Sequence, residues 1–342
     1  MGKLLLIVLV VSGCMLFSCT PTHKEKDVSI HLLDTTQDSL YYSMFVDSIS
    51  YIALEDKEEC LIGRVSDVII TNEHLFVLDG KQQIVWGFDR DGKYQFNINK
   101  RGNGPGEYMR LVQFEYDKER NELLLLDGWS KSILHYTVDG KFVKSEALDI
   151  YCSDFKIVDD GYILSMLGGS DSLGGVFHYV SDEGKSRKLI GRSYDLPCNY
   201  DWEMVNYDGN IGLMAPPLDN ILYACDSLGQ LVERISFRMH PLPSDKYETN
   251  ETMEHLSDFV RTNYMESSHW IYATYWCAEY GLRVFLYDKV NGASYVGQKL
   301  LNDMDGIPFT SMTSFGNNNL FIFATLKNGI DCNPVLQILH LK

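Results

Sequence analysis

The segment Leu75-Phe76-Val77-Leu78-Asp79 has a counterpart 48 positions later, Leu123-Leu124-Leu125-Leu126-Asp127. The same interval separates Asp91-Gly92-Lys93 from Asp139-Gly140-Lys141. Three further Gly-containing turns continue the series, at intervals of 44, 45 and 63 residues: Glu183-Gly184-Lys185, Leu228-Gly229-Gln230 and Asn291-Gly292-Ala293. Each unit contains apolar strands and short turns. A repeat of about 45 residues built from four short strands is typical of a β-propeller blade.

The two ends of the chain complete this pattern. The last unit contains only three plausible strands, at about 310–315, 320–326 and 335–341. The alternating segment Ile49–Leu54 near the N-terminus can supply the fourth. Pairing the termini leaves no open sheet edge. The sequence therefore predicts an all-β, six-bladed β-propeller over residues 47–342, closed by the N-terminal strand against the C-terminal blade.

One interval in the series is longer than the others. The 63-residue step contains about 18 extra residues between the fourth and fifth blades. Met253, Leu256 and Val260 recur there at roughly helical spacing. We expect one short inserted helix near residues 244–257.

The N-terminus has the three-part form of a secretory signal. A basic start is followed by the apolar run Leu4–Val11, which is too short for an ordinary membrane-spanning helix. The ending Leu16-Phe17-Ser18-Cys19 resembles a bacterial lipobox, so residues 1–18 are expected to be removed and Cys19 lipidated, with Cys14 as the alternative. An ordinary cleaved signal is a further alternative. Residues 19–46 would then form the lipidated Cys, stalk and lead-in of an outer membrane lipoprotein, on its periplasmic or cell-surface side.

Composition excludes one class of partner. The chain has 30 Lys and Arg against 47 Asp and Glu, a formal net charge of −17, and no basic stripe. Nucleic-acid binding, which requires neutralisation of phosphates, is therefore not expected. Six cysteines besides Cys14 and Cys19 show no zinc-site spacing, and their disulfide pairing stays open: Cys60, Cys152, Cys198, Cys225, Cys277 and Cys332.

A family resemblance supports the fold. Arg101-Gly102-Asn103-Gly104-Pro105-Gly106-Glu107-Tyr108 resembles the signature of six-bladed β-propeller lipoproteins of Gram-negative bacteria, a group related to NHL-repeat and TolB-like propellers. Residues 52–63 are similar to that family's opening strand, and Asn333-Pro334-Val335-Leu336 to its end. The resemblance covers about residues 47–342. It implies the fold, but no general reaction.

Candidate ligand-binding residues lie in loops that join the outer strand of one blade to the inner strand of the next. Such loops face the funnel at which propellers usually bind ligands. The candidates are Arg101, Asn103, Glu107, Tyr108, Tyr151, Asp154, Tyr200, Asp201, Trp202, His269, Trp270, Asp303 and Asp305. Aromatic rings beside carboxylates suit carbohydrates, because a ring stacks on a sugar face and carboxylates accept hydroxyl hydrogen bonds. The alternative is that the aromatic residues pack between blades and that residues 101–108 clamp the backbone.

Catalytic signatures are mostly absent from the sequence. It contains neither HExxH nor GxSxG, and its nine His are scattered. The segments Asp89–Gly92 and Asp303–Gly306 partly match a calcium loop but lack its other ligands, which favours turns. No cofactor is predicted, although a divalent metal bound by residues of several blades would escape detection in one sequence.

These observations lead to one functional hypothesis and two rivals. The hypothesis is a non-catalytic envelope module that binds a glycan, peptide or envelope protein through its funnel face. The first rival is a metal-dependent enzyme of the NHL or lactonase kind. The second is a protein scaffold that acts through the 244–257 insertion.

Overall fold

The computed structural model describes residues 28–31, 36–166, 177–181, 185–189, 203–207, 209–214, 221–225, 230–238, 259–277, 281–308, 314–317, 320–325 and 332–342. The signal segment with Cys14 and Cys19, the candidates Tyr200, Asp201 and Trp202, and the helix predicted near residues 244–257 lie outside these ranges. Within them, the only helical segments are two single turns, η1 (Tyr42–Met44) and η2 (Glu58–Cys60). No helix in these ranges has the length and apolarity needed to cross a bilayer.

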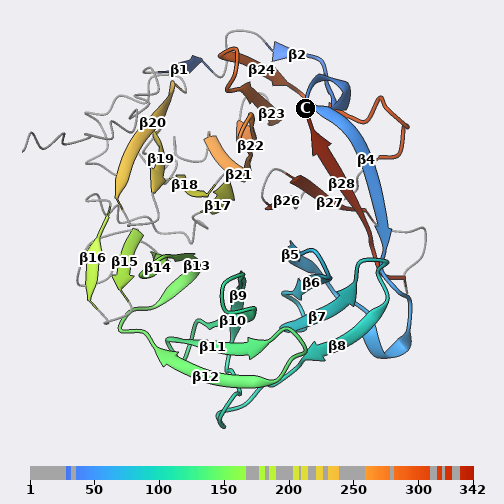
Figure 1. The fold of residues 1–342 in the computed structure, drawn as a ribbon. Helices are drawn as coiled ribbons and strands as arrows, with labels where there is room; N and C mark the ends of the chain where they lie inside the picture. Colours follow the sequence, from blue (N-terminus) through green and yellow to red (C-terminus); the bar gives the residue numbers. More distant parts are fainter. Residues whose placement is uncertain are drawn as a thin grey trace, which may run out of the picture.

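The strands form six blades arranged around a central axis, which confirms the predicted all-β propeller (Figure 1). Within each blade the first strand is innermost. Blades one to three consist of β5 (Val65–Ile70), β6 (His74–Asp79), β7 (Ile84–Asp89) and β8 (Tyr94–Ile98); β9 (Leu111–Asp117), β10 (Glu122–Asp127), β11 (Ser132–Thr137) and β12 (Phe142–Ala147); and β13 (Cys152–Val158), β14 (Gly161–Met166), β15 (Phe177–Ser181) and β16 (Ser186–Lys188).

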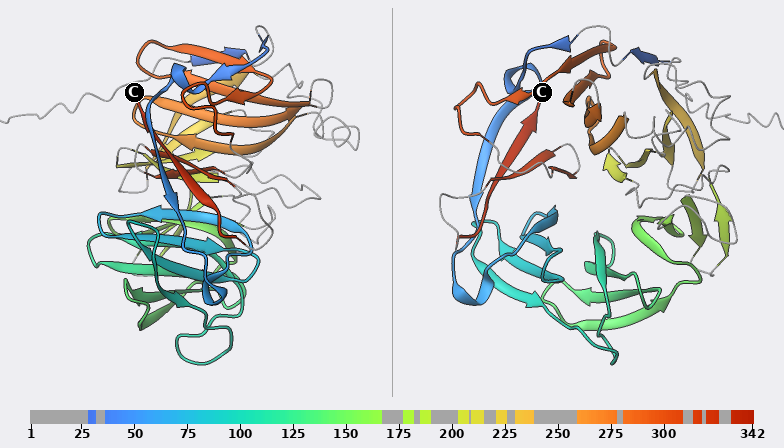
Figure 2. Two further views of the ribbon diagram at one scale, coloured as in Figure 1. Left: turned by 90° about the vertical axis from the view of Figure 1, so that its right-hand side faces the viewer. Right: turned by 180° about the vertical axis from the view of Figure 1, so that it is seen from behind.

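Blades four and five continue the order around the ring. They consist of β17 (Glu203–Tyr207), β18 (Asn210–Met214), β19 (Ile221–Cys225) and β20 (Leu231–Arg238); and β21 (Phe259–Glu266), β22 (Trp270–Cys277), β23 (Gly281–Asp288) and β24 (Ala293–Gly297). Figure 2 shows the ring from its edge and from behind.

Blade six joins the two ends of the chain. It consists of β26 (Ser314–Asn317), β27 (Leu320–Thr325), β28 (Val335–Leu341) and β4 (Val46–Ala53). The antiparallel pairing of β28 with β4 places Val335 opposite Ala53 and Leu341 opposite Val46. The predicted closure of the ring by the N-terminal strand is therefore confirmed.

The lead-in before β4 runs along the outside of the ring. β1 (Val28–His31) adds a parallel strand to β20, and β2 (Thr36–Gln37) adds one to β24. β3 (Leu40–Tyr41) then pairs with β25 (Leu300–Leu301). The fully buried rings of Tyr42 and Phe45 follow and pack between blades five and six. The lead-in thereby connects the outer edges of blades four, five and six.

The hydrophobic core lies between neighbouring blades. In β6, Leu75 and Val77 pack toward blade six, whereas Phe76 and Leu78 pack toward blade two. Successive side chains of a strand point to opposite faces of the sheet, and here both faces are covered. This explains why β6 and β10 read as continuous apolar runs rather than as alternating patterns.

The strand alternation creates two different faces of the ring. Loops between blades and turns between the second and third strands lie on one face, which we call the loop face. The remaining hairpin turns lie on the opposite, hairpin face. On the loop face the Asp127 carboxylate at the end of β10 accepts the backbone N–H groups of Met109, Arg110, Trp129 and Ser130. Asp79 makes the equivalent contacts in blade one, so the repeated strand-end Asp fixes each loop to its blade.

Candidate functional site

The segment Arg101–Tyr108 on the loop face is built as a structural clamp. Tyr108 is fully buried and its hydroxyl donates to the carbonyl oxygens of Gln83 at 2.6 Å and Ile98 at 3.1 Å. Burial raises the pKa of Tyr108 to about 12, so the hydroxyl keeps its proton. The hydroxyl of Tyr136, in blade two, donates to the Gly106 carbonyl. The loop therefore joins blade one to blade two.

Glycine and glutamate complete this clamp. The Glu107 carboxylate accepts the Gly104 N–H at 2.8 Å, and a Cβ atom at Gly102 would collide with it. Gly106 has φ +73°, a left-handed conformation that favours glycine. Of the four candidates in this loop, Tyr108 and Glu107 thus hold the loop together. Arg101 and Asn103 have exposed side chains.

One pair of candidates, His269 and Trp270, lies away from the loops between blades, whereas Asp303 and Asp305 lie in the connection from blade five to blade six. His269 lies in the turn between β21 and β22, on the hairpin face, and Trp270 is the first residue of β22. The Trp270 ring is buried, with its centroid 6.0 Å from that of Phe45. The Trp270 ring packs in the core, because the turn before it joins two strands of blade five rather than two blades. The repeat spacing did not distinguish such a turn from a loop between blades.

Asp303 and Asp305 follow β25 and hold the outer rim of the propeller. Asp303 accepts the backbone N–H of Ser43 at 2.9 Å and its hydroxyl at 2.5 Å. Asp305 accepts the hydroxyl of Tyr51, on the outermost strand of blade six, at 2.6 Å. These carboxylates anchor the lead-in and β4, so the structure does not bring them together with the Arg101 loop.

Tyr151 is part of an exposed aromatic group on the loop face. It is 52% exposed, and Trp129 in the neighbouring turn is 59% exposed. The Lys131 Nζ lies 4.0 Å from the centroid of the Tyr151 ring, and the Arg110 guanidinium carbon lies 5.9 Å from that of Trp129. We call Arg110, Trp129, Lys131 and Tyr151 the aromatic patch.

Backbone hydrogen bonds hold the patch in place. The Gly128 N–H donates to the Arg110 carbonyl at 3.0 Å, and the Leu148 N–H donates to the Lys131 carbonyl at 2.6 Å. Together with the buried Asp127, they fix three loop segments side by side. The two rings are therefore presented on a rigid support rather than on a free loop.

The inner strands of the blades line the channel at the centre of the ring, and several of them contain a β-bulge at the same position. The pairing register shifts just before Asp67 in β5 and Asp154 in β13. Each carboxylate accepts the N–H of the following residue at 2.7 Å, and Gln113 of β9 does the same at 2.9 Å. The bulges turn one polar side chain per strand toward its neighbours.

Asp154, the remaining described candidate, belongs to this channel. Lys156 forms ion pairs with Glu115 and, at 3.9 Å, with Asp154. Burial raises the pKa of Asp154 to about 6 and that of Asp67 to about 7. Burial opposes the charge of Lys156, but the carboxylates of Asp154, Glu115 and Asp67 outweigh this effect and raise its pKa. The ammonium group of Lys156 thus interacts electrostatically with three carboxylates.

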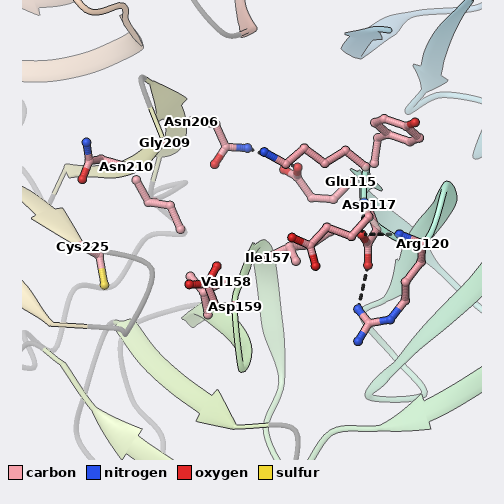
Figure 3. A pocket seen from close by; sticks show the side chains of 14 residues that line it. Glu115, Asp117, Arg120, Ile157, Val158, Asp159, Asn206, Gly209, Asn210 and Cys225 are labelled. Atoms are coloured by element: carbon pink, nitrogen blue, oxygen red, sulfur yellow. Dashed lines mark hydrogen bonds and ion pairs between the residues drawn. The ribbon is translucent and has the colours of Figure 1, made fainter.

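A pocket of about 230 Å³ opens next to this cluster, on the hairpin face between blades two, three and four (Figure 3). Glu115 lines it, and Asn206 donates to Glu115 at 3.4 Å. At its rim Arg120 pairs with Asp117 at 2.7 Å. Within the described ranges, no group of three or more His, Cys, Asp or Glu side chains is arranged to hold a metal ion.

The structure describes the calcium-like segment Asp89–Gly92 and several of the cysteines. The Asp89 carboxylate accepts the N–H groups of Asp91 and Lys93, so this calcium-like segment is a turn. The thiols of Cys60, Cys152 and Cys332 form no disulfide.

Trp129, Arg110 and Lys131 were not among the sequence candidates. A signal for Trp129 was present, since it occupies the repeat position of Lys81 in a polar turn after the strand-end Asp. A large aromatic residue in a turn of this kind has no strand in which to be buried. No feature of the sequence distinguishes Arg110 and Lys131, because only the fold places them over the two aromatic rings.

Comparisons with known proteins agree on the fold. A crystal structure of a Bacteroides fragilis protein named “putative exported protein” is similar, with a TM-score of 0.71 and 16% identity over 92% of this chain and 99% of that chain. A DUF4221 family member from Bacteroides vulgatus has a TM-score of 0.54 and 10% identity, covering 87% and 97% of the two chains. No curated protein matches. A family model described as a domain of unknown function, DUF4934, matches residues 27–331, and the chain belongs to this family.

Proposed function

We propose that this protein is a lipid-anchored, non-catalytic binding module of the bacterial cell envelope that binds glycans through its loop face. The observation that carries the proposal is the exposure of Trp129 and Tyr151 on neighbouring, hydrogen-bonded loops. Isolated exposed apolar side chains are common on proteins, but a grouped pair of large rings is a feature of binding surfaces.

Carbohydrate suits this surface better than an apolar partner. A ring offers its face to the C–H side of a sugar, while neighbouring donors and acceptors bind hydroxyl groups. Arg110 supplies donors beside Trp129, and the exposed Asn103 supplies both donors and acceptors on the adjoining loop. Because Asp127 fixes two of these segments, binding would cost little ordering of the backbone.

The proposed location follows from the N-terminal sequence. Residues 1–18 have the form of a lipoprotein signal, and Cys19 is the acceptor that we propose for the lipid. Substitution Cys19→Ala should release the protein from the membrane fraction into the soluble fraction. If the Cys19→Ala protein stays in the membrane and the Cys14→Ala protein is released, the lipid is on Cys14. Retention of the double variant would contradict lipid anchoring.

Glycan binding is tested with a panel of neutral and acidic polysaccharides. The measurement is the Kd for each, compared between wild type, Trp129→Ala and Tyr151→Ala. Since an aromatic contact contributes roughly 0.5–1.5 kcal/mol, each substitution should weaken binding about two- to tenfold. Tyr41→Ala is the matched control, because Tyr41 is 42% exposed on β3, which pairs with β25 in a separate two-stranded sheet. Failure of every polysaccharide to bind, or equal loss in the control, contradicts the proposal.

A further inference from the structure

The loop segments around the aromatic patch carry more cationic than acidic side chains, although the whole chain has a net charge of −17. Besides the carboxylates of Glu107, Asp127 and Asp149, the segments 99–110, 127–131 and 148–151 present four cationic side chains: Lys100, Arg101, Arg110 and Lys131. All but Lys131 are exposed. In a chain with more acidic than basic residues, such a gathering of cations marks a surface with its own complementary partner.

Two carboxylates beside the aromatic patch, Asp127 and Glu107, already accept hydrogen bonds from the backbone. Asp79 and Asp127 are fully buried and accept backbone N–H groups. Glu107 accepts the Gly104 N–H of its own loop. Asp149 is exposed in the segment 148–151, and further acidic residues lie at 55–59, in the loop between blades six and one. The cations therefore outnumber the acids around the aromatic patch.

We infer that the glycan bound by the loop face is an acidic polysaccharide, with carboxylate or sulfate groups on its sugar units. This inference rests on the function proposed above and specifies its ligand. It is carried by the pairing of each exposed ring with a cation: Arg110 with Trp129, and Lys131 with Tyr151.

The geometry of these two pairs matches the chemistry of an acidic sugar. Such a sugar has a flat C–H face and an anionic group at its edge. A ring stacks on the face, and a cation beside the ring meets the anion. The Arg110 guanidinium has a planar fork of donors that fits a carboxylate or a sulfate. Since more than half of each aromatic residue stays exposed beside its cation, stacking surface is available.

Two such pairs lie on adjacent segments of the same face. Trp129 and Lys131 belong to one turn, and that turn bonds to the segments that carry Arg110 and Tyr151. The patch thus places two ring-and-cation pairs side by side, which suits two neighbouring sugar units of one polysaccharide chain. The exposed Arg101 adds positive charge in the same loop as Arg110, where its backbone forms an isolated β-bridge with Tyr108.

The test compares two polymers that share a backbone. Binding of the soluble protein, without residues 1–18, is measured by calorimetry for polygalacturonate and for its fully methyl-esterified form, which lacks the charge. We expect polygalacturonate to bind at least tenfold more tightly, with an affinity that falls as salt is raised. Arg110→Gln and Lys131→Gln should each weaken polygalacturonate binding about three- to tenfold and leave the binding of the ester unchanged.

The test includes one control variant, and three of its outcomes would overturn the inference. Lys141→Gln changes an exposed cation on the hairpin face, where Lys141 pairs with Asp139, and should have no effect. Circular dichroism and thermal melting confirm that each variant is folded. Equal binding of both polymers overturns the acidic inference and leaves glycan binding intact. Binding of neither by a folded protein overturns the inference, and the wider panel then decides glycan binding itself. Binding only to phosphatidylserine vesicles assigns the cations to a membrane and also overturns it.

Discussion

The side chain of Asn333 bonds to the backbone of Cys60 across the junction of the two chain ends. Its Nδ2 donates to the Cys60 carbonyl at 2.8 Å and to the Glu55 carbonyl at 2.7 Å, while its Oδ1 accepts the Ile62 N–H at 2.8 Å. Asn333 is fully buried. The closure of the ring thus uses a polar latch in addition to the pairing of β28 with β4.

Substitution Asn333→Ala should destabilise the propeller strongly. It leaves buried backbone groups of the 55–62 loop without their hydrogen bonds, at a cost of about 2–4 kcal/mol in the free energy of unfolding. Urea unfolding measures this quantity. The exposed Asn103 provides the control, since Asn103→Ala should change stability by less than about 0.5 kcal/mol. Equal effects at the two positions would show that the latch does not contribute.

The clamp formed by Tyr108 gives a second stability prediction. Tyr108→Phe removes a buried hydroxyl that bonds to Gln83 and Ile98, and should lower the free energy of unfolding by about 1–2 kcal/mol. Tyr116→Phe removes an exposed hydroxyl bonded to Asn121 and should have a much smaller effect. A neutral Tyr108→Phe would contradict the structural role of the 101–108 segment.

The channel carboxylates predict a specific dependence of stability on pH. The pKa values of Asp154, about 6, and Asp67, about 7, are raised above those of an unfolded chain, near 3.9. Between about pH 4 and 7 the folded protein therefore binds more protons than the unfolded one, so stability falls as pH rises, by up to about 1.4 kcal/mol per pH unit for each group. The groups facing them are Lys156 and Glu115.

Amide variants isolate this effect from other titrating groups. Asp67→Asn and Asp154→Asn should each gain stability relative to wild type as pH is raised from 4 to 7, measured by urea unfolding at each pH. Asp117→Asn should show the opposite trend, since bonds to Arg120 and Glu119 outweigh burial and lower the pKa of Asp117. A constant difference between Asp154→Asn and wild type across this range would contradict the raised pKa.

A buried ionic network joins blades four and five. Glu266 accepts two hydrogen bonds from Arg234, at 3.0 and 2.7 Å, and one from Lys289 at 2.8 Å. Glu266→Gln removes the buried carboxylate to which Arg234 and Lys289 bond and should cost about 3–5 kcal/mol. Asp139→Asn, which removes the exposed pair with Lys141, should have a much smaller effect, because solvent screens this pair. Thermal unfolding compares the two, and similar losses would refute the importance of the network.

Sequence periodicity predicted the architecture because the same physical constraint recurs in each blade. The apolar run ending at Asp79 recurs at Asp127 since both strands are buried on both faces and both carboxylates fix a loop. The closing strand was predictable for a related reason, because an unpaired edge would remain without it. The Arg101–Tyr108 segment predicted the fold, and the structure explains this through its contacts with two blades.

The binding surface was less predictable because it depends on which turns the ring brings together. Tyr151 was identified from its loop, whereas Trp129 lies in a turn inside a blade and Arg110 in a loop with no distinguishing motif. Trp270 is the opposite case, because it follows a polar turn and yet its ring is buried against Phe45. Residue type and spacing predict a strand and its turns, but exposure depends on contacts between blades.

Hydrogen–deuterium exchange of the protein with and without oligogalacturonate tests the location of the binding surface most directly. We expect slower exchange in residues 100–110, 128–131 and 148–151, which form the loop face around the aromatic patch. The turns that line the pocket, at 118–120 and 159–160, should exchange at unchanged rates. Protection confined to those pocket turns, or no protection anywhere at a saturating concentration, would contradict this expectation.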